Sequence, residues 1–246
     1  MEYKTFWDKS NPAFVILHWW GGSSESWEQV AEMLAKDFFV IVVDYPCGSK
    51  LLDCDKVYTL DDYADLVKNL IEELWLKDFI LLWHSNGGAI ATKLVTKYPD
   101  LPIKKLILNN SAGIRKDKKR TLKRKIFGLV SKIAKPVFTL PWMWKIRNLF
   151  YRAIWWQDYL EAEKNPYKKQ TFLNMINEDL QDTFPKIQVD TLLIWWENDT
   201  YTPLEDWKKI HSLIQNSKFT VIPDVRHGIH LQNPQELVRV ILENVK

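Results

Sequence analysis

The stretch FILLWHSNGGAIATKLVTKYP, residues 79–99, places a strand, a sharp turn and a helix in direct succession. Its first residues are apolar and mostly branched, as a strand covered on both faces requires. Ser85 stands at the turn, within the pentapeptide WHSNG (83–87). The spacing matches the nucleophile-elbow pattern G-x-S-x-G, with the second glycine present and the first one replaced. Such a turn exposes a serine hydroxyl at a helix N-terminus, where negative charge is stabilised. A serine that merely caps a helix is the competing interpretation.

Around this stretch, apolar strand-like runs alternate with helical patterns. The other strand-like runs are 14–17, 38–43, 104–109, 191–195 and 218–223, and the helical stretches are 24–36, 59–75, 87–98, 203–214 and 234–245. This alternation predicts an α/β fold with a mostly parallel central sheet and helices on both faces. Residues 113–186 interrupt it with a strandless, basic and then aromatic segment that is too long for a plain connection. We therefore predict a core of residues 1–112 and 187–246, with residues 113–186 inserted as a helical cap.

The loop after the first buried strand, HWWGGSSESW (18–27), is a second candidate element of the site. A loop in this place can direct a backbone N–H toward the serine. The N–H of Trp20, together with that of Asn86, would then form an oxyanion hole. Each such donor is worth about 3–4 kcal/mol of transition-state stabilisation. His18 precedes this loop and His84 precedes the serine, and we expect both to be structural.

An acid and a base follow later strands. Asp199 comes just after one strand, in WENDTYTP, and His227 comes after the last, in RHGIH. A serine needs an imidazole to take its proton, and the imidazole needs a carboxylate to set its tautomer. His230 is an alternative base. Asp206 and Asp224 are alternative acids, but neither lies in the same pattern after a strand.

Five segments, HWWGGSSESW, DYPCGSK, WHSNGG, WENDTYTP and RHGIH, together resemble the α/β-hydrolase superfamily, in its single-domain, lid-bearing serine hydrolase or esterase type. The resemblance spans nearly the whole chain. It implies the α/β-hydrolase fold, with Ser85 as nucleophile, Asp199 as acid and His227, the first histidine of its pair, as base. A serine nucleophile argues against haloalkane dehalogenase and epoxide hydrolase chemistry, which use aspartate.

The function that the resemblance implies is hydrolysis of a carboxylic ester or related acyl bond, through an acyl-enzyme on Ser85 and without a cofactor. Carbon–carbon bond hydrolysis or acyl transfer with the same triad stays open. So does a non-catalytic protein of this fold that binds a ligand. The aromatic residues of the cap favour an apolar acyl or alcohol group. The histidines and cysteines show no metal-ligand spacing, and no phosphate-binding or dinucleotide motif is present.

Tryptophan is abundant where the superfamily has glycine. The chain has 13 tryptophans and 8 glycines among 246 residues, against a usual glycine content of about 7%. Nine tryptophans occupy positions that suit glycine or another small residue: Trp7, Trp19, Trp75, Trp83, Trp144, Trp155, Trp156, Trp196 and Trp207. We hypothesise that these are glycines encoded by UGA, and TGG codons in the gene would contradict this. We expect Trp19, Trp83 and Trp196 to crowd one region, so that Trp83→Gly stabilises the chain or raises its activity.

Composition sets the remaining expectations. Hydrophobic residues make up 46% of the chain and charged residues 26%, an ordinary globular balance that excludes a disordered or fibrous chain. With no signal-like or spanning segment, and with two cysteines that make no disulfide framework, we expect a cytoplasmic protein. Residues 115–135 hold ten basic residues and one acidic residue. We interpret them as a solvated face of the cap, and expect a small-molecule substrate, no nucleic acid and no stable membrane insertion.

Overall fold

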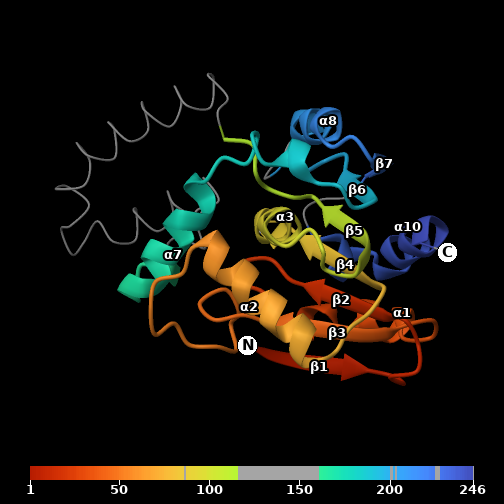
Figure 1. The fold of residues 1–246 in the computed structure, drawn as a ribbon, viewed down its shortest axis with the longest axis horizontal. Coiled ribbons are helices and arrows are strands. Elements are labelled where there is room, and N and C mark those ends of the chain that lie inside the picture. The colour runs from red at the N-terminus through yellow and green to blue at the C-terminus, as the bar shows by residue number, and fades with distance from the viewer. Residues whose placement is uncertain (86, 116–160, 200–201, 203, 225–227, 246) are drawn as a thin grey trace.

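The computed structural model describes residues 1–85, 87–115, 161–199, 202, 204–224 and 228–245. Within these ranges a seven-stranded sheet runs in the order β1-β3-β2-β4-β5-β6-β7 (Figure 1). The strands are β1 (Glu2–Phe6), β2 (Ala13–Leu17), β3 (Phe39–Asp44), β4 (Phe79–His84), β5 (Ile103–Asn109), β6 (Thr191–Trp196) and β7 (Ser217–Ile222). The helices are η1 (Ser24–Trp27), α1 (Glu28–Leu34), α2 (Leu60–Glu73), α3 (Gly87–Lys97), α7 (Pro166–Asn177), η3 (Phe184–Lys186), α8 (Leu204–Leu213), α9 (Ile229–Gln232) and α10 (Pro234–Val245).

The predicted α/β fold with a mostly parallel sheet is confirmed. Strands β2 to β7 pair in parallel, and every strand expected from an apolar run is present. The exception is β1, which pairs antiparallel with β3 and which the sequence analysis missed. Its residues EYKTF are all exposed or half-buried, as an edge strand allows, so β1 lacks the continuous apolar run that marks the inner strands.

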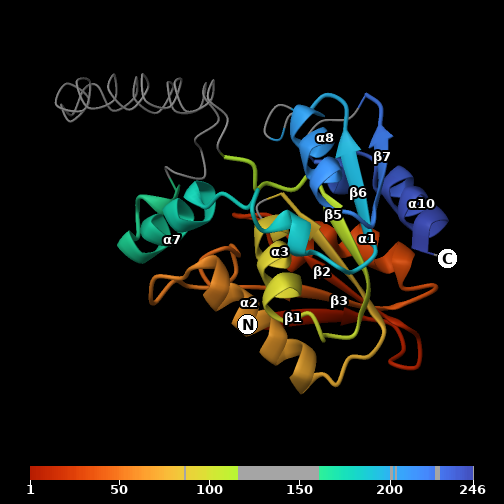
Figure 2. The same cartoon turned by 45° about the horizontal axis from the view of Figure 1, so that its top comes forward.

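Two hydrophobic clusters cover the two faces of the sheet. Alternate residues of β4 point to opposite sides, so Leu81 and Trp83 join the cluster beneath α2 and α3, while Ile80 and Leu82 join the one beneath α1 and α10. Figures 1 and 2 show these helix pairs on opposite faces of the sheet. Each buried aliphatic side chain contributes about 1.5–3 kcal/mol, so the strand ends that carry the candidate site rest on a rigid support.

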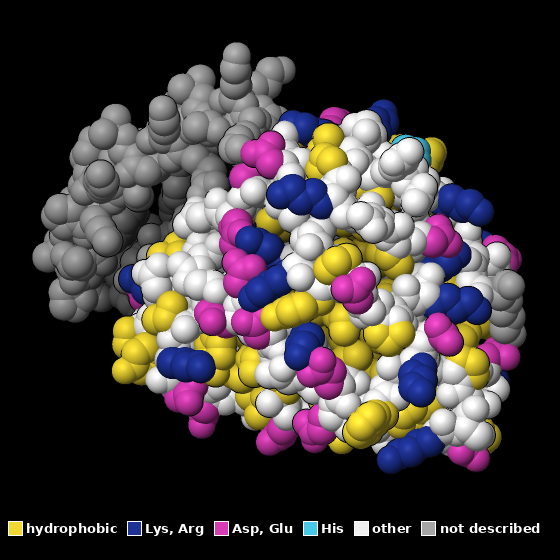
Figure 3. All heavy atoms as spheres, in the orientation of Figure 1, with side chains coloured by type: hydrophobic (Ala, Val, Ile, Leu, Met, Phe, Trp, Pro, Cys, Tyr) yellow, Lys and Arg dark blue, Asp and Glu magenta, His cyan; other side chains and the backbone are white. Residues whose placement is uncertain are grey.

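The outer face of α2 and α3 carries mixed charges. Lys93 of α3 pairs with Asp61 of α2 at 3.2 Å, and Lys97 pairs with Asp65 one turn further on at 2.5 Å. On the face shown in Figure 3, blue and magenta side chains are interspersed among small hydrophobic areas. No helix in the described ranges is long and apolar enough to cross a bilayer.

Only residues 113–115 and 161–186 of the predicted cap are described, so most of the basic segment 115–135 lies outside the description. Helix α7 docks on the loop that precedes α2 through hydrogen bonds between side chains and backbone. The hydroxyl of Thr171 accepts from the Tyr58 N–H at 2.9 Å, and the Asn174 amide donates to the Tyr58 carbonyl at 3.0 Å. The cap boundaries and its role stay predictions.

A disulfide joins Cys47 to Cys54, with their Cα atoms 4.4 Å apart. One bond is not a framework, but the sequence analysis had not predicted any pairing of the two cysteines. Asn165, which caps the N-terminus of α7, donates to the Cys54 carbonyl at 3.0 Å. The disulfide therefore lies in the loop that connects β3 to α2 and supports α7.

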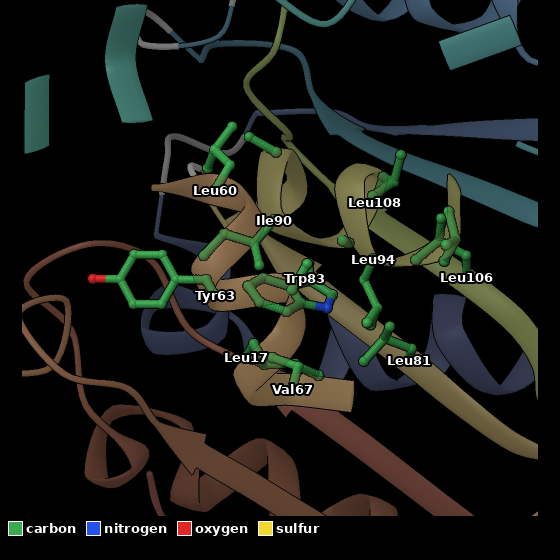
Figure 4. Close-up of a cluster of buried hydrophobic side chains, with 14 of the residues drawn as sticks. Leu17, Leu60, Tyr63, Val67, Leu81, Trp83, Ile90, Leu94, Leu106 and Leu108 are labelled. Carbon is green, nitrogen blue, oxygen red and sulfur yellow. The ribbon is translucent and has the colours of Figure 1, made fainter. Parts of the chain in front are cut away.

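The tryptophans at expected glycine positions fall into two structural groups. Trp7 and Trp75 have positive φ angles of 70° and 53° and are 72% and 84% exposed. That left-handed backbone favours glycine over any residue with a Cβ. Trp83, in contrast, is fully buried among Leu17, Tyr63 and their neighbours (Figure 4).

The expectation that Trp83 crowds Trp19 and Trp196 is wrong. Trp83 belongs to the cluster beneath α2 and α3, whereas Trp196 belongs to the cluster on the opposite face and Trp19 packs against it. Trp19 and Trp196 do share a neighbour, since both rings contact His84, at centroid distances of 5.6 and 5.0 Å. Side chains alternate between the two faces of a sheet, and Trp83 points to the face opposite Trp19 and Trp196, so the sheet lies between them.

Candidate active site

Ser85 occupies the turn between β4 and α3 with a φ angle of 58°, in the left-handed region. Its N–H donates to the Asn109 carbonyl at 3.0 Å, and its own carbonyl accepts from the N–H groups of Gly88 and Ala112, each at 3.0 Å. An N-cap residue has an extended backbone, so the left-handed conformation argues against the helix-cap interpretation. Strained backbone held by surrounding hydrogen bonds is typical of functional positions.

The glycines after Ser85 permit the close approach that the turn requires. A Cβ at Gly87 would lie 2.4 Å from Cε3 of Trp83, and one at Gly88 would lie 2.0 Å from Oγ of Ser111. Neither distance is possible for real atoms, so larger residues would push α3 away from the strand. Asn86, the predicted second oxyanion donor, lies outside the described residues.

Asp199 follows β6, near the strand end that neighbours β5, and is 6% exposed. The carboxylate accepts hydrogen bonds from the N–H of Thr202 at 3.2 Å, from the Thr202 hydroxyl at 3.0 Å and from the side-chain amide of Asn110. A buried carboxylate needs such donors, because desolvation is otherwise costly. The alternative acids differ, since Asp224 is exposed and Asp206 is only partly buried in α8.

The sequence analysis missed Asn110 and Thr202. Asn110 follows β5 directly, has a φ angle of 44° and is fully buried. Its N–H continues the ladder to the Ile194 carbonyl at 2.9 Å. A polar residue at the carboxyl end of a central strand was a signal the sequence contained, but asparagine alone does not indicate which carboxylate it contacts.

His227, the predicted base, lies outside the described residues. His230, the alternative, is 2% exposed in α9 and stacks on Trp27, with ring centroids 4.7 Å apart and planes at 7°. On another side the ring of Trp19 lies 4.5 Å away. This burial between indoles is typical of a packing residue.

The loop of residues 18–27 leaves β2 beside the Ser85 turn, since Leu17 pairs with Trp83 on the neighbouring strand. We call this segment the oxyanion loop, after the role that the sequence predicts for it. It is tied to the loop after β3: the Gly21 N–H donates to the Gly48 carbonyl at 2.7 Å, and the Lys50 N–H donates to the Gly22 carbonyl at 2.8 Å. The predicted donor Trp20 is therefore in a well-anchored segment at the same edge of the sheet as Ser85.

Beneath this loop, Asp44 forms a buried polar centre. Its Oδ1 accepts from the Ser49 hydroxyl at 2.6 Å, the Ser24 N–H at 3.0 Å and His18 Nε2 at 3.1 Å. Burial by itself would raise the pKa of Asp44, but these hydrogen bonds outweigh it and lower the pKa from 3.8 to about 2. Asp44 therefore stays ionised under ordinary conditions. No group of three or more candidate metal ligands occurs among the described residues.

The comparison with known families agrees with this arrangement. The model of the alpha/beta hydrolase fold family matches residues 12–234, so the chain belongs to the α/β-hydrolase family. The resemblance inferred from the sequence is thereby confirmed.

Among individual proteins, the chain is 24% identical to the uncharacterized hydrolase YugF of Bacillus subtilis, over 99% of this chain and 93% of that protein. It is 23% identical to the bifunctional esterase/perhydrolase DCH of Acinetobacter calcoaceticus, over 99% and 95% of the two chains. The esterase structure from Exiguobacterium antarcticum superposes with a TM-score of 0.75 and 22% identity, covering 98% of this chain and 93% of that one. The relatives support a hydrolase, and the structural likeness supports the fold.

Proposed function

We propose that the chain is a serine hydrolase that cleaves a carboxylic ester or related acyl bond through an acyl-enzyme on Ser85. The observation that carries the proposal is the left-handed Ser85 at the start of α3, at the strand edge where Asp199 is also buried and held by Asn110 and Thr202. The esterase named among the relatives points in the same direction.

In the proposed reaction, Ser85 Oγ attacks the carbonyl carbon while His227 takes its proton. The N–H groups of Trp20 and Asn86 bind the negative oxygen of the tetrahedral intermediate. The alcohol leaves with the proton from His227, and the acyl group remains on Ser85. A water molecule, deprotonated by His227, then attacks the acyl carbon and releases the carboxylic acid and free Ser85. Asp199 orients His227, and the chemistry requires no cofactor.

The apolar contacts near the oxyanion loop favour an apolar acyl or alcohol group. Phe172 of α7 packs against Trp20 with ring centroids 5.4 Å apart, and Met175 lies buried in the same cluster. These side chains are almost wholly buried, so the preference rests on the hydrocarbon character of the packing around the loop and on the aromatic residues of the cap. We therefore propose short-chain aliphatic esters as the first substrates to test.

Hydrolysis of p-nitrophenyl butyrate, with labelling by a fluorophosphonate, tests this function. Ser85→Ala should abolish both, because the nucleophile is lost while a small side chain still fits the turn. The matched control is Ser212→Ala, which removes an exposed hydroxyl in α8 and should change neither. Labelling that survives Ser85→Ala would move the nucleophile elsewhere, and a folded wild type with neither activity would favour the binding-protein alternative.

A further inference from the structure

The peptide unit between Trp19 and Trp20 is held from one side by two hydrogen bonds. The Trp19 carbonyl accepts from His18 Nδ1 at 2.7 Å and from the Gly22 N–H at 3.0 Å. A carbonyl oxygen can only accept, so Nδ1 of His18 is the donor. In a planar trans peptide the C=O and the N–H point in opposite directions. The two bonds therefore direct the Trp20 N–H away from His18.

The Trp20 N–H finds no acceptor among the residues that the structure describes, although Trp20 is only 1% exposed. Buried backbone N–H groups are nearly always paired, so a free one is a donor available to a ligand. The loop also lies against the nucleophile turn. A Cβ placed on Gly87 would be 3.2 Å from the His18 carbonyl oxygen.

His18 is itself held rigidly. Its ring is fully buried, and its second nitrogen, Nε2, lies 3.1 Å from Asp44 Oδ1. The ring stacks on Tyr45, with centroids 4.8 Å apart and planes at 20°, and Ser49 fixes the carboxylate at 2.6 Å. Rotation of the ring would break both of its hydrogen bonds.

We propose that His18 is a positioning residue for the oxyanion hole: Asp44 holds its ring, and its Nδ1–H holds the Trp19 carbonyl so that the Trp20 N–H faces the reacting oxygen. The inference rests on the proposed function of Ser85. Without the Nδ1 donor, only the Gly22 N–H holds the Trp19 carbonyl, so the peptide turns more readily and presents its carbonyl to the developing negative charge. Because that charge exists only in the transition state, kcat falls while KM changes little.

Two substitutions separate the hydrogen bonds of His18. The amide nitrogen of asparagine takes the place of Nδ1, so His18→Asn keeps a donor for the Trp19 carbonyl and loses the bond to Asp44. The amide nitrogen of glutamine takes the place of Nε2, so His18→Gln keeps the bond to Asp44 and loses the one to Trp19. Both lose the stacking on Tyr45, which makes each variant the control for the other.

The expected result is an inverted order of activity and stability. In p-nitrophenyl butyrate hydrolysis, kcat should fall about 10²-fold or more in His18→Gln, with little change in KM, and substantially less in His18→Asn. The melting temperature should be lower for His18→Asn, because the buried Asp44 loses one of its three donors. A higher kcat in His18→Gln than in His18→Asn, or losses of kcat that simply follow the melting temperatures, would overturn the proposal.

A measurement without turnover keeps this inference separate from the proposed function. The ¹³C chemical shift of the Trp19 carbonyl reports its hydrogen bonds directly. It should stay near the wild-type value in His18→Asn and move in His18→Gln. If the wild type hydrolyses no ester, the proposed function fails, whereas equal shifts in both variants would overturn the role of His18 whatever the activity.

Discussion

Left-handed backbone occurs at Ser85 and Asn110 and again at Trp7 and Trp75, for different reasons. At the first pair it directs a hydroxyl and an amide into the candidate site, and strained backbone of this kind is common at functional sites. At the second pair the side chains are exposed, so no buried contact compensates for the Cβ. These two positions are where the structure bears most directly on the glycine hypothesis.

Trp75→Gly should stabilise the protein by about 1 kcal/mol, since glycine adopts positive φ at no steric cost. The indole is 84% exposed, so its removal sacrifices little packing. Thermal and urea unfolding measure the gain. Trp75→Ala is the matched control, because it removes the indole and keeps the Cβ. Equal stability of the Gly and Ala variants would show that the backbone at residue 75 is not strained.

At Trp83 the loss of packing outweighs any gain from glycine. Its indole is fully buried beneath α2 and α3, so Trp83→Gly opens a cavity, and large-to-small changes of this kind cost about 3–5 kcal/mol. We therefore expect Trp75→Gly to stabilise the protein and Trp83→Gly to destabilise it. The sequence-based expectation for Trp83 took no account of how completely the surrounding side chains enclose it.

His227→Ala and His230→Ala should affect different properties, one the kcat of the protein and the other its stability. His230 stacks on Trp27, so its loss should lower the melting temperature while folded protein keeps substantial esterase activity. Loss of the proposed base should do the reverse, with a fall in kcat of about 10³-fold or more at nearly unchanged stability. Assays at a temperature where both variants are folded distinguish the two. A larger fall in kcat for His230→Ala would reverse the assignment.

At the scale of elements, the oxyanion loop, the end of β3 and the loop that carries Cys47 and Cys54 form one hydrogen-bonded unit. Asp44 is its centre, and the backbone bonds of Gly21 and Gly22 to the neighbouring loop complete it. The adjoining helix α7 contacts the same unit through Asn165 and Phe172. A substitution in α7 is therefore expected to shift the oxyanion loop, because the two segments pack directly against each other.

Asp44 makes the stability of this unit depend on acid. Its folded pKa of about 2 lies below the ordinary 3.8, so the stabilisation is complete above about pH 4 and is lost as the pH falls toward 2. The loss amounts to about 2 kcal/mol of unfolding free energy. Urea unfolding at several pH values between about 5 and about 2 measures this loss of unfolding free energy. Asp44→Asn should lack this part of the acid slope, and an unchanged slope in that variant would refute the assignment.

At the scale of the molecule, the inner strands and most helices were predictable because each has a periodic apolar pattern. β1 was not, since EYKTF is an exposed edge whose pairing depends on β3. Ser85 was assigned from its strand–turn–helix motif and Asp199 from its place just after a strand, both in the pattern of the superfamily. Asn110, Thr202 and the network of Asp44 were not assignable, because those contacts join residues from separate strands and loops whose side-chain directions only the fold defines.

The most direct test of the account is mass spectrometry of the intact chain after brief mixing with p-nitrophenyl butyrate near neutral pH and an acid quench, which unfolds the protein before the acyl group is hydrolysed. The account predicts one added butyryl group, located by digestion in the peptide that contains Ser85 and absent from Ser85→Ala. An acyl group on another residue, or the same labelling in Ser85→Ala, would contradict it.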